Sequence, residues 1–355
     1  MITISLCMIV KNEENTIARC LDSVKDIVDE IIIVDTGSTD KTKEIVSQYA
    51  NRIFDFQWID DFAAARNFAF KNAKMDYIFW LDADDILMKD DCKKLSKLKE
   101  TLDTTIDSVT MHYNLNIDEN GNVITSLRRN RLVKRENNFQ WYGPVHEYLE
   151  VWGNILNSEV AVTHCSMHHD SDRNLLIYEK RIKQGEQFSP RDLFYYANEL
   201  FEHDRLEDAI KYYKQFLATD NGWIEDYISA CGRLSDCYSA LDDYENELYF
   251  ILKSFKYDSP RAEFCCRLGY RFLHNNHSYQ ALFWYKLATE LEKPSDKLGM
   301  INHSCWTWLP HLQLCVCYSQ IGNHALAYEH NEIARKYLPD HPSILHNKQY
   351  LESIL

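Results

Sequence analysis

The chain has 355 residues, of which 45% are hydrophobic and 26% charged, and its formal net charge is −15. At roughly 150 residues per domain this length predicts about two domains, and the globular composition excludes a chain that is disordered throughout. Both halves of the chain are acidic, which argues against sequence-independent binding to nucleic acid or to an anionic membrane surface.

The N-terminus and the cysteines bear on the cellular compartment. Residues 1–10 are apolar but lack a preceding basic segment, so we interpret them as a first strand rather than a signal peptide. No stretch of about 18 apolar residues occurs, so no transmembrane segment is expected. The 11 cysteines are odd in number and contain no C-x-x-C pair, which favours free thiols over a disulfide framework or a zinc ribbon. We therefore expect a cytoplasmic protein.

The first half of the chain alternates short apolar runs with amphipathic segments. Strands are predicted at residues 3–10, 30–34, 53–58 and 76–81, and helices between them at 14–24, 40–49 and 61–72. Such alternation is typical of βαβ units and a parallel sheet. From residue 108 onward two strand-like runs flank a hairpin turn at 118–121, and shorter runs follow at 131–133, 139–141 and 159–164. We expect an α/β domain with a parallel front and an antiparallel extension.

From about residue 174 the pattern is helical only. Four copies of one arrangement begin at Leu193, Cys231, Cys265 and His311, with apolar, small and aromatic residues at offsets 0, +3, +4, +7, +16, +20 and +23. Helix pairs of about 34 residues with this spacing resemble tetratricopeptide repeats. Glu247 and Asn331 depart from the pattern. An unrelated helical bundle is the alternative interpretation.

An acidic motif follows the strand predicted at 76–81. Asp82, Asp84 and Asp85 place three carboxylates within four residues. Ligands of open α/β sheets bind beyond the carboxyl ends of the strands, and clustered carboxylates repel one another unless a cation lies among them. Oxygen ligands suit Mg²⁺ or Mn²⁺, which commonly bridge to phosphate oxygens. The simpler alternative is an acidic loop that caps the next helix.

Two further residues fit a nucleotide site. Asp35 ends a buried strand and can accept hydrogen bonds from a base or ribose, and Arg66 can offer a charged fork to a nucleotide. Taken alone, Arg66 would be a surface helical arginine. The sequence has neither G-x-G-x-x-G nor G-x-x-x-x-G-K-[ST], so neither a dinucleotide-binding fold nor a P-loop is supported.

Several motifs in order resemble the signatures of family 2 glycosyltransferases with a GT-A fold. They are residues 7–13, 34–40, 65–67 and 81–84. Residues 143–147, His164 and residues 173–176 resemble the subgroup that carries tetratricopeptide repeats, which includes bacterial peptide S-glycosyltransferases. The resemblance implies an α/β GT-A domain over 1–185 and an all-α domain of tetratricopeptide-like repeats over 186–355.

The resemblance also implies roles for individual residues. A nucleotide would be contacted by Val10, Glu13, Asp35, Arg66 and Asp82.

Metal and catalysis would fall to a second group of residues. Asp84 would bind Mn²⁺ or Mg²⁺ together with His164, although His168 and His169 are alternatives and His164 fits a structural role equally well. Glu147 would be the catalytic base, with His146 beside it.

These residues predict a metal-dependent, inverting transfer of a hexose-type sugar from a UDP-sugar to an acceptor, which includes a peptide or protein side chain. The repeats would hold that acceptor or bury a homodimer interface. One alternative is a nucleotidyltransferase, although its usual Gly-rich basic loop is missing after the first strand. Another is a peptide-binding repeat scaffold with a degenerate sugar-nucleotide domain.

Overall fold

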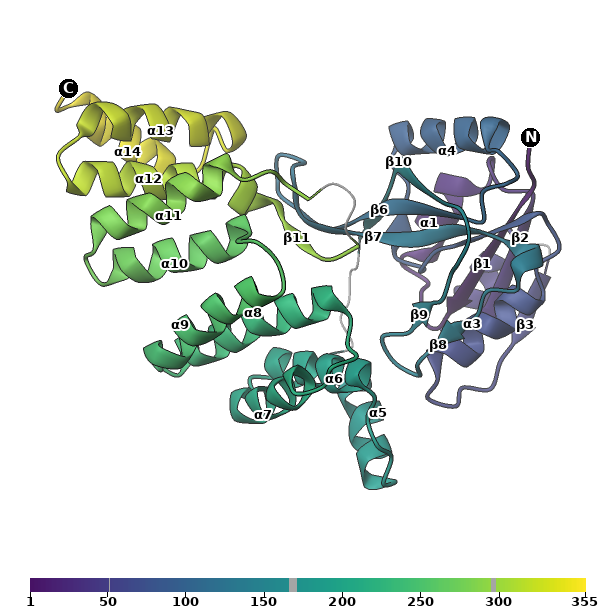
Figure 1. The fold of residues 1–355 in the computed structure, drawn as a ribbon. Helices are drawn as coiled ribbons and strands as arrows, with labels where there is room; N and C mark the ends of the chain where they lie inside the picture. Colours follow the sequence, from purple (N-terminus) through teal and green to yellow (C-terminus); the bar gives the residue numbers. More distant parts are fainter. Residues whose placement is uncertain (51, 166–170, 295–297) are drawn as a thin grey trace. The chain divides into compact units, whose positions relative to one another are not determined.

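The computed structural model describes all residues except 51, 166–170 and 295–297 (Figure 1). The chain forms two compact units. The first comprises residues 1–116 and 126–186, and the second comprises residues 117–125 and 187–355. The short segment 117–125 is the tip of a long hairpin, and it groups with the helical unit although it lies within the sequence of the first.

The first unit is built on one large mixed sheet with strand order β3-β2-β1-β4-β7-β6-β10-β5. The front strands are all parallel, as predicted. They are β1 (Ile4–Val10), β2 (Glu30–Asp35), β3 (Arg52–Asp55) and β4 (Tyr77–Trp80). The helices among them are α1 (Ile17–Val24), α2 (Thr42–Val46) and α3 (Phe62–Lys71), and α4 (Lys89–Thr101) follows the acidic motif.

The rest of the sheet differs from the predicted antiparallel extension. β7 (Val123–Lys134) is antiparallel to β4, but β10 (Ile155–His164) runs parallel to β6 (Ser108–Ile117). The reason is the connection between β7 and β10, which contains the 3₁₀ turn η1 (Arg135–Asn137) and the small hairpin of β8 (Trp141–Tyr142) and β9 (Tyr148–Leu149). β7 is also one continuous strand where two separate runs were predicted, because its polar residues interrupt the apolar pattern without interrupting the pairing.

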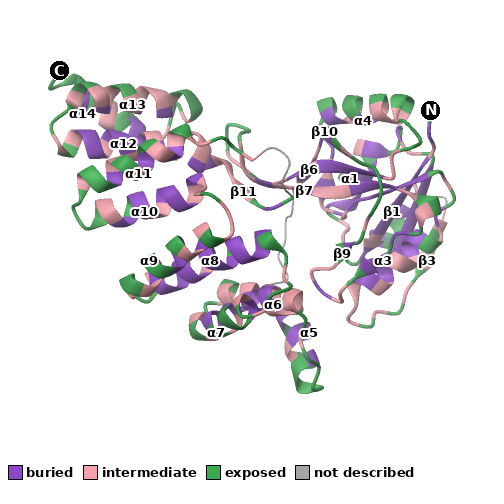
Figure 2. Ribbon diagram, in the orientation of Figure 1, coloured by how far each residue is buried: buried purple, intermediate pink, exposed green. Residues whose placement is uncertain are grey.

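The front of the sheet is covered on both faces. The residues of the front strands divide between two hydrophobic clusters. One contains Leu6 and Ile33 and packs with α1, and the other contains Cys7 and Ile32 and packs with α3. β1, β2 and β4 are buried, as Figure 2 shows for β1, whereas β3 is partly exposed. A sheet buried on both faces needs consecutive apolar residues, which explains the near-continuous runs in β1 and β2. The polar residues that follow these runs therefore collect at the carboxyl edge of the sheet.

The second unit consists of antiparallel helix pairs, which confirms the predicted succession of an α/β domain and tetratricopeptide-like repeats. The pairs are α6 (Pro190–Glu202) with α7 (Leu206–Leu217), α8 (Ile224–Ala240) with α9 (Tyr244–Lys253), α10 (Ala262–His274) with α11 (Ser278–Glu290), and α12 (Trp308–Gln320) with α13 (His324–Tyr337). The unit also contains η2 (Ser254–Lys256), β11 (Ile301–Asn302), η3 (His303–Trp306) and the final helix α14 (Pro342–Glu352), while α5 (Ser171–Lys183) belongs to the first unit. Within the described residues, no helix has the length and apolar character needed to cross a membrane.

The residues that depart from the repeat pattern are compensated by polar contacts. The buried Glu247 carboxylate pairs with Arg271 of the next repeat, and the buried Asn331 side chain donates to the carbonyl oxygen of Ile344 at 3.0 Å. Gly269 keeps its small position for a steric reason, since a Cβ there would lie 2.7 Å from the ring of Tyr285. The degenerate copies therefore keep the helix packing of the repeat.

Candidate active site

Asp35 is the last residue of β2 and its side chain is almost completely buried. Its Oδ1 accepts hydrogen bonds from the backbone N–H groups of Gly37 at 3.0 Å and Ser38 at 2.9 Å. Its Oδ2 is buried and has no hydrogen-bond partner among the described residues. A buried acceptor without a partner costs free energy. Asp35 therefore has one oxygen available to a donor outside the described residues.

Val10 and Glu13 lie at the end of β1, with different surroundings. The Val10 side chain is buried in the core, and its carbonyl oxygen accepts from the backbone N–H of Thr36 at 2.9 Å. The Glu13 side chain accepts from the Thr16 hydroxyl at 2.6 Å. Burial raises the pKa of Glu13, and the nearby carboxylates of Asp84 and Asp82 raise it further. Glu13 thus lies within electrostatic reach of the acidic motif.

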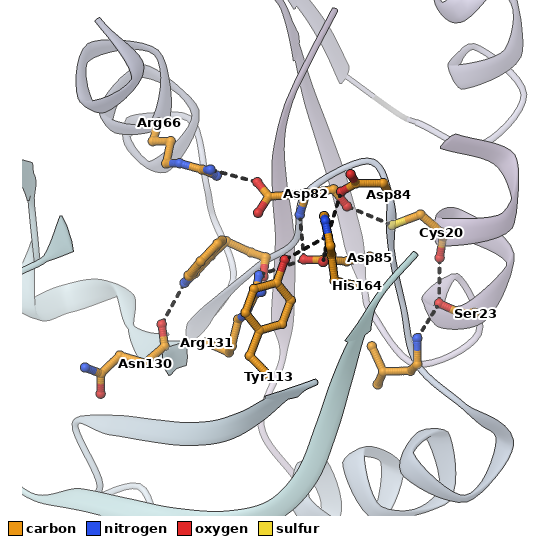
Figure 3. Close-up of polar contacts among 12 residues, drawn as sticks. Cys20, Ser23, Arg66, Asp82, Asp84, Asp85, Tyr113, Asn130, Arg131 and His164 are labelled. Carbon is orange, nitrogen blue, oxygen red and sulfur yellow. Dashed lines mark hydrogen bonds and ion pairs between the residues drawn. The ribbon is translucent and has the colours of Figure 1, made fainter. Parts of the chain in front are cut away.

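The acidic motif forms a closed turn directly after β4 (Figure 3). The backbone N–H of Asp85 donates to the carbonyl oxygen of Asp82 at 3.1 Å, and the backbone N–H of Asp82 donates to Asp85 Oδ2 at 3.0 Å. Asp85 then begins the short strand β5 (Asp85–Ile86), which pairs with β10 in an antiparallel register that sets Asp85 opposite His164. This register brings the histidine to the carboxylates.

Asp84, Asp85 and His164 form a cluster with the donor set of a cation site. Nδ1 of His164 lies 3.5 Å from Asp84 Oδ1 and 3.7 Å from Asp85 Oδ1, and one ligand atom from each residue falls within 4.8 Å of the others. The two carboxylates raise the pKa of His164 to about 10. The buried Asp85 Oδ1 has no hydrogen-bond partner among the described residues. Two carboxylate oxygens and an imidazole fit Mn²⁺ or Mg²⁺.

Sequence reasoning chose Asp84 and His164, and the structure brings the two together. It also adds Asp85, which is part of the acidic run, and Arg131, which no sequence motif indicated. Arg131 is fully buried and its Nη1 lies 3.0 Å from Asp85 Oδ2. His168 and His169, the alternatives to His164, lie outside the described residues.

Arg66 joins the acidic motif to Glu147. It lies in α3, whose first turn is capped by Asp61. Its Nη2 donates to Asp82 Oδ1 at 2.7 Å, as Figure 3 shows, and its Nε donates to Glu147 Oε1 at 2.5 Å. Burial alone would raise the pKa of Asp82, but the charges of Arg66 and Arg131 hold it well below its usual range. The guanidinium predicted to contact a nucleotide is thus engaged with two carboxylates of its own chain.

The loop after β8 presents Glu147. Gly143 and His146 have positive φ angles of 93° and 48°, and the carbonyl oxygen of Pro144 accepts from the backbone N–H of Phe62 at 2.9 Å. This contact ties the loop to α3, which carries Arg66. The His146 ring stacks against Tyr178, with ring centroids 6.4 Å apart.

Both parts of the chain have similar known proteins. Residues 5–153 match the model of the family described as Glycosyl transferase family 2. The chain is 30% identical over 228 residues to the SPbeta prophage-derived glycosyltransferase SunS of Bacillus subtilis, covering 60% of this chain and 53% of that protein. It is 35% identical over 150 residues to a TPR repeat-containing protein of Synechococcus elongatus, covering 42% of this chain and 36% of that protein. The chain therefore spans about a third to a half of the length of these relatives.

Solved structures show weaker similarity. The TPR protein YrrB aligns with 50% of this chain and 82% of its own, at 16% identity and a TM-score of 0.38. TarS 1-349 of S. aureus aligns with 72% of this chain and 91% of its own, at 15% identity and a TM-score of 0.36. Scores this low carry no argument about the site. Residues 5–153 are therefore similar to family 2 glycosyltransferases, and the helix pairs that follow them resemble tetratricopeptide repeats.

Proposed function

We propose that the chain transfers a sugar from a UDP-sugar to an acceptor, with a divalent cation and with inversion at the anomeric carbon. The observation that carries the proposal is the meeting of Asp84 and His164 with the Arg66-linked pair of Asp82 and Glu147 at one edge of the sheet. Carboxylates for a cation and a separate carboxylate for a proton are the two groups that such a transfer needs.

The donor nucleotide would lie between the ends of β1, β2 and β4. The unpartnered Oδ2 of Asp35 suits a donor N–H on the base, such as N3–H of uracil. Asp84 and His164 would hold Mn²⁺ or Mg²⁺, which when bound neutralises charge on a leaving diphosphate. Asp82 and Asp84 are only partly exposed, so a ligand reaching them would lose most of its contact with water.

Glu147 would act as the general base. Arg66 holds its Oε1, and no hydrogen bond or ion pair to its Oε2 is found among the described residues. As the acceptor oxygen or sulfur attacks the anomeric carbon, its proton passes to Glu147. The bond from that carbon to the diphosphate oxygen breaks, and the diphosphate leaves with the bonding electrons. A single displacement of this kind inverts the anomeric configuration.

The acceptor is the part of the proposal that rests on the helical unit. Stacked helix pairs present extended surfaces suited to a peptide or protein segment. We therefore place a peptide or protein side chain, carrying a hydroxyl or a thiol, as the acceptor class.

The test is Mn²⁺-dependent hydrolysis of UDP-hexoses by the purified protein, followed by mass spectrometry of candidate peptides. Asp84→Ala and His164→Ala should abolish the activity, whereas Asp90→Ala should not, because Asp90 is an exposed acid paired with Lys93 on α4. UDP binding without hydrolysis or transfer would favour a scaffold, and UDP-sugar synthesis from UTP and a sugar phosphate would favour a nucleotidyltransferase.

A further inference from the structure

Asp85 is held so that its two carboxylate oxygens have different surroundings. Its Oδ2 accepts from the backbone N–H of Asp82 at 3.0 Å and lies 3.0 Å from Arg131 Nη1. Its Oδ1 has no hydrogen-bond partner among the described residues, although the whole side chain is excluded from solvent. Both oxygens of a buried carboxylate normally have hydrogen-bond or ion partners. Asp85 Oδ1 is therefore a candidate ligand atom for a cation.

The unpartnered oxygen faces the histidine of the cation cluster. Asp85 Oδ1 lies 3.7 Å from Nδ1 of His164, and the same nitrogen lies 3.5 Å from Asp84 Oδ1 (Figure 3). The strand pairing of Asp85 with His164 fixes this arrangement through the backbone. A cation placed among the three atoms would satisfy an oxygen that has no hydrogen-bond partner among the described residues.

Arg131 adds a second restraint on Asp85, beside the hydrogen bond from the backbone N–H of Asp82. Its guanidinium lies 3.8 Å from the centre of the Trp80 ring and 4.4 Å from that of Tyr113, and Nη1 also donates to the carbonyl oxygen of Trp80 at 3.3 Å. Two aromatic rings and an ion pair leave the guanidinium, and with it the Asp85 carboxylate, little freedom to rotate.

We propose that Asp85 is the third protein ligand of the divalent cation, alongside Asp84 and His164. This inference rests on the proposed function, since it takes the cation at Asp84 and His164 as given. The alternative is that Asp85 serves only as the buried partner of Arg131. The two roles predict different Mn²⁺ binding when Arg131 is replaced and the Asp85 carboxylate is kept.

The experiment measures Mn²⁺ affinity of the full chain from the electron paramagnetic resonance signal of free Mn²⁺, without substrate. Asp85→Asn should weaken Mn²⁺ binding by more than about tenfold, because a charged ligand is lost. Arg131→Met should bind Mn²⁺ at least as tightly as the wild type, because the carboxylate remains, the backbone N–H of Asp82 still holds its Oδ2, and a competing cation is removed. The double variant Asp85→Asn/Arg131→Met leaves no buried charge without its partner, and it should show the same loss as Asp85→Asn. Asp90→Asn is the matched surface control.

Two results would overturn the inference. One is Mn²⁺ binding by Asp85→Asn, or by the folded double variant, within twofold of the wild type. The other is a loss in Arg131→Met equal to that in Asp85→Asn, which would mark the pair as structural. If Asp84→Ala loses Mn²⁺ and Asp85→Asn keeps it, only this inference fails. A wild-type protein that does not bind Mn²⁺ would remove the proposed cation site itself.

Discussion

Nε of Arg66 lies 2.5 Å from Oε1 of Glu147, so a residue on α3 holds the carboxylate that we propose as the base. The same guanidinium also reaches Asp82. One side chain therefore links the proposed proton acceptor with the acidic motif, and changes at Arg66 should be felt at both.

Arg66→Lys should lower kcat for UDP-hexose hydrolysis by more than about tenfold, because an ammonium cannot reproduce two separately directed N–H contacts. Steady-state kinetics would measure the effect. Arg135→Lys is a suitable control, since Arg135 is exposed and donates to the carbonyl oxygen of Met75. Full activity in Arg66→Lys would show that the link to Glu147 has no part in turnover.

Asp35→Asn should weaken UDP binding by about 1–3 kcal/mol, because its new amide group would face the N–H donor of the base with another donor. Mn²⁺ affinity should stay unchanged, since Asp35 is not part of the cation cluster. Calorimetric titrations with UDP and with Mn²⁺ would separate the two effects. Asp55→Asn, at an exposed acid that pairs with Lys43, should leave both affinities intact. Unaltered UDP binding in Asp35→Asn would show that the uracil base does not contact Asp35.

Asp226 on α8 should make the stability of the chain depend on pH. Burial raises the pKa of Asp226 to about 7, and the charge of Glu225 adds to the effect while Arg191 opposes it. The folded state therefore binds this proton more tightly than the unfolded state, so stability is lost as pH rises from about 4 to about 7. Asp226→Asn should remove this loss and stabilise the protein at pH 8 by about 2–4 kcal/mol.

Melting temperatures of Asp226→Asn and the wild type at pH 5 and pH 8 would check this expectation. The gain should be much larger at pH 8. Asp236→Asn is the control, because Asp236 pairs with Arg267 and its loss should not stabilise the protein at either pH. An equal gain at both pH values would contradict the assignment.

Two helical glycines of the repeats should respond oppositely to alanine. At Gly269 the added methyl would lie 2.7 Å from the buried Tyr285 ring, so Gly269→Ala should destabilise the protein by about 1–3 kcal/mol. At Gly232 the nearest atom, Arg267 Nη2, would be at 3.5 Å, so Gly232→Ala should be neutral or stabilising by about 0.5–1 kcal/mol. Urea unfolding of both variants gives the comparison, and equal effects would contradict the packing argument.

The features that the sequence predicted correctly are local ones. The parallel front was predicted because short apolar runs alternate with amphipathic helical segments. The helix pairs were predicted because apolar, small and aromatic residues recur at the same offsets along the chain. Asp84 was accessible to sequence reasoning because it follows a strongly apolar strand. Its proximity to His164 could be predicted only from the family resemblance, because no local sequence pattern connects two residues 80 positions apart.

The missed features depend on non-local pairing. β5 has only two residues, too few to leave a pattern, yet its pairing with β10 makes Asp85 a neighbour of His164. Arg131 begins the run predicted at 131–133, directly after the polar residues 128–130 that suggested an interruption of the strand. Its burial is explained by its ion pair with Asp85 and by its contacts with the rings of Trp80 and Tyr113, which only the structure shows. The direction of β10 was likewise decided by the path of the preceding loop.

The β5–β10 pairing also sets the order in which the site can be assembled. The acidic turn is complete once β4 and its neighbours are folded, but its histidine belongs to β10, which follows a long intervening segment. Contacts between such distant parts of a chain form late, because loop-closure entropy must be overcome first. During synthesis the carboxylates therefore precede the histidine. The complete cluster would then indicate that β10 has joined the sheet.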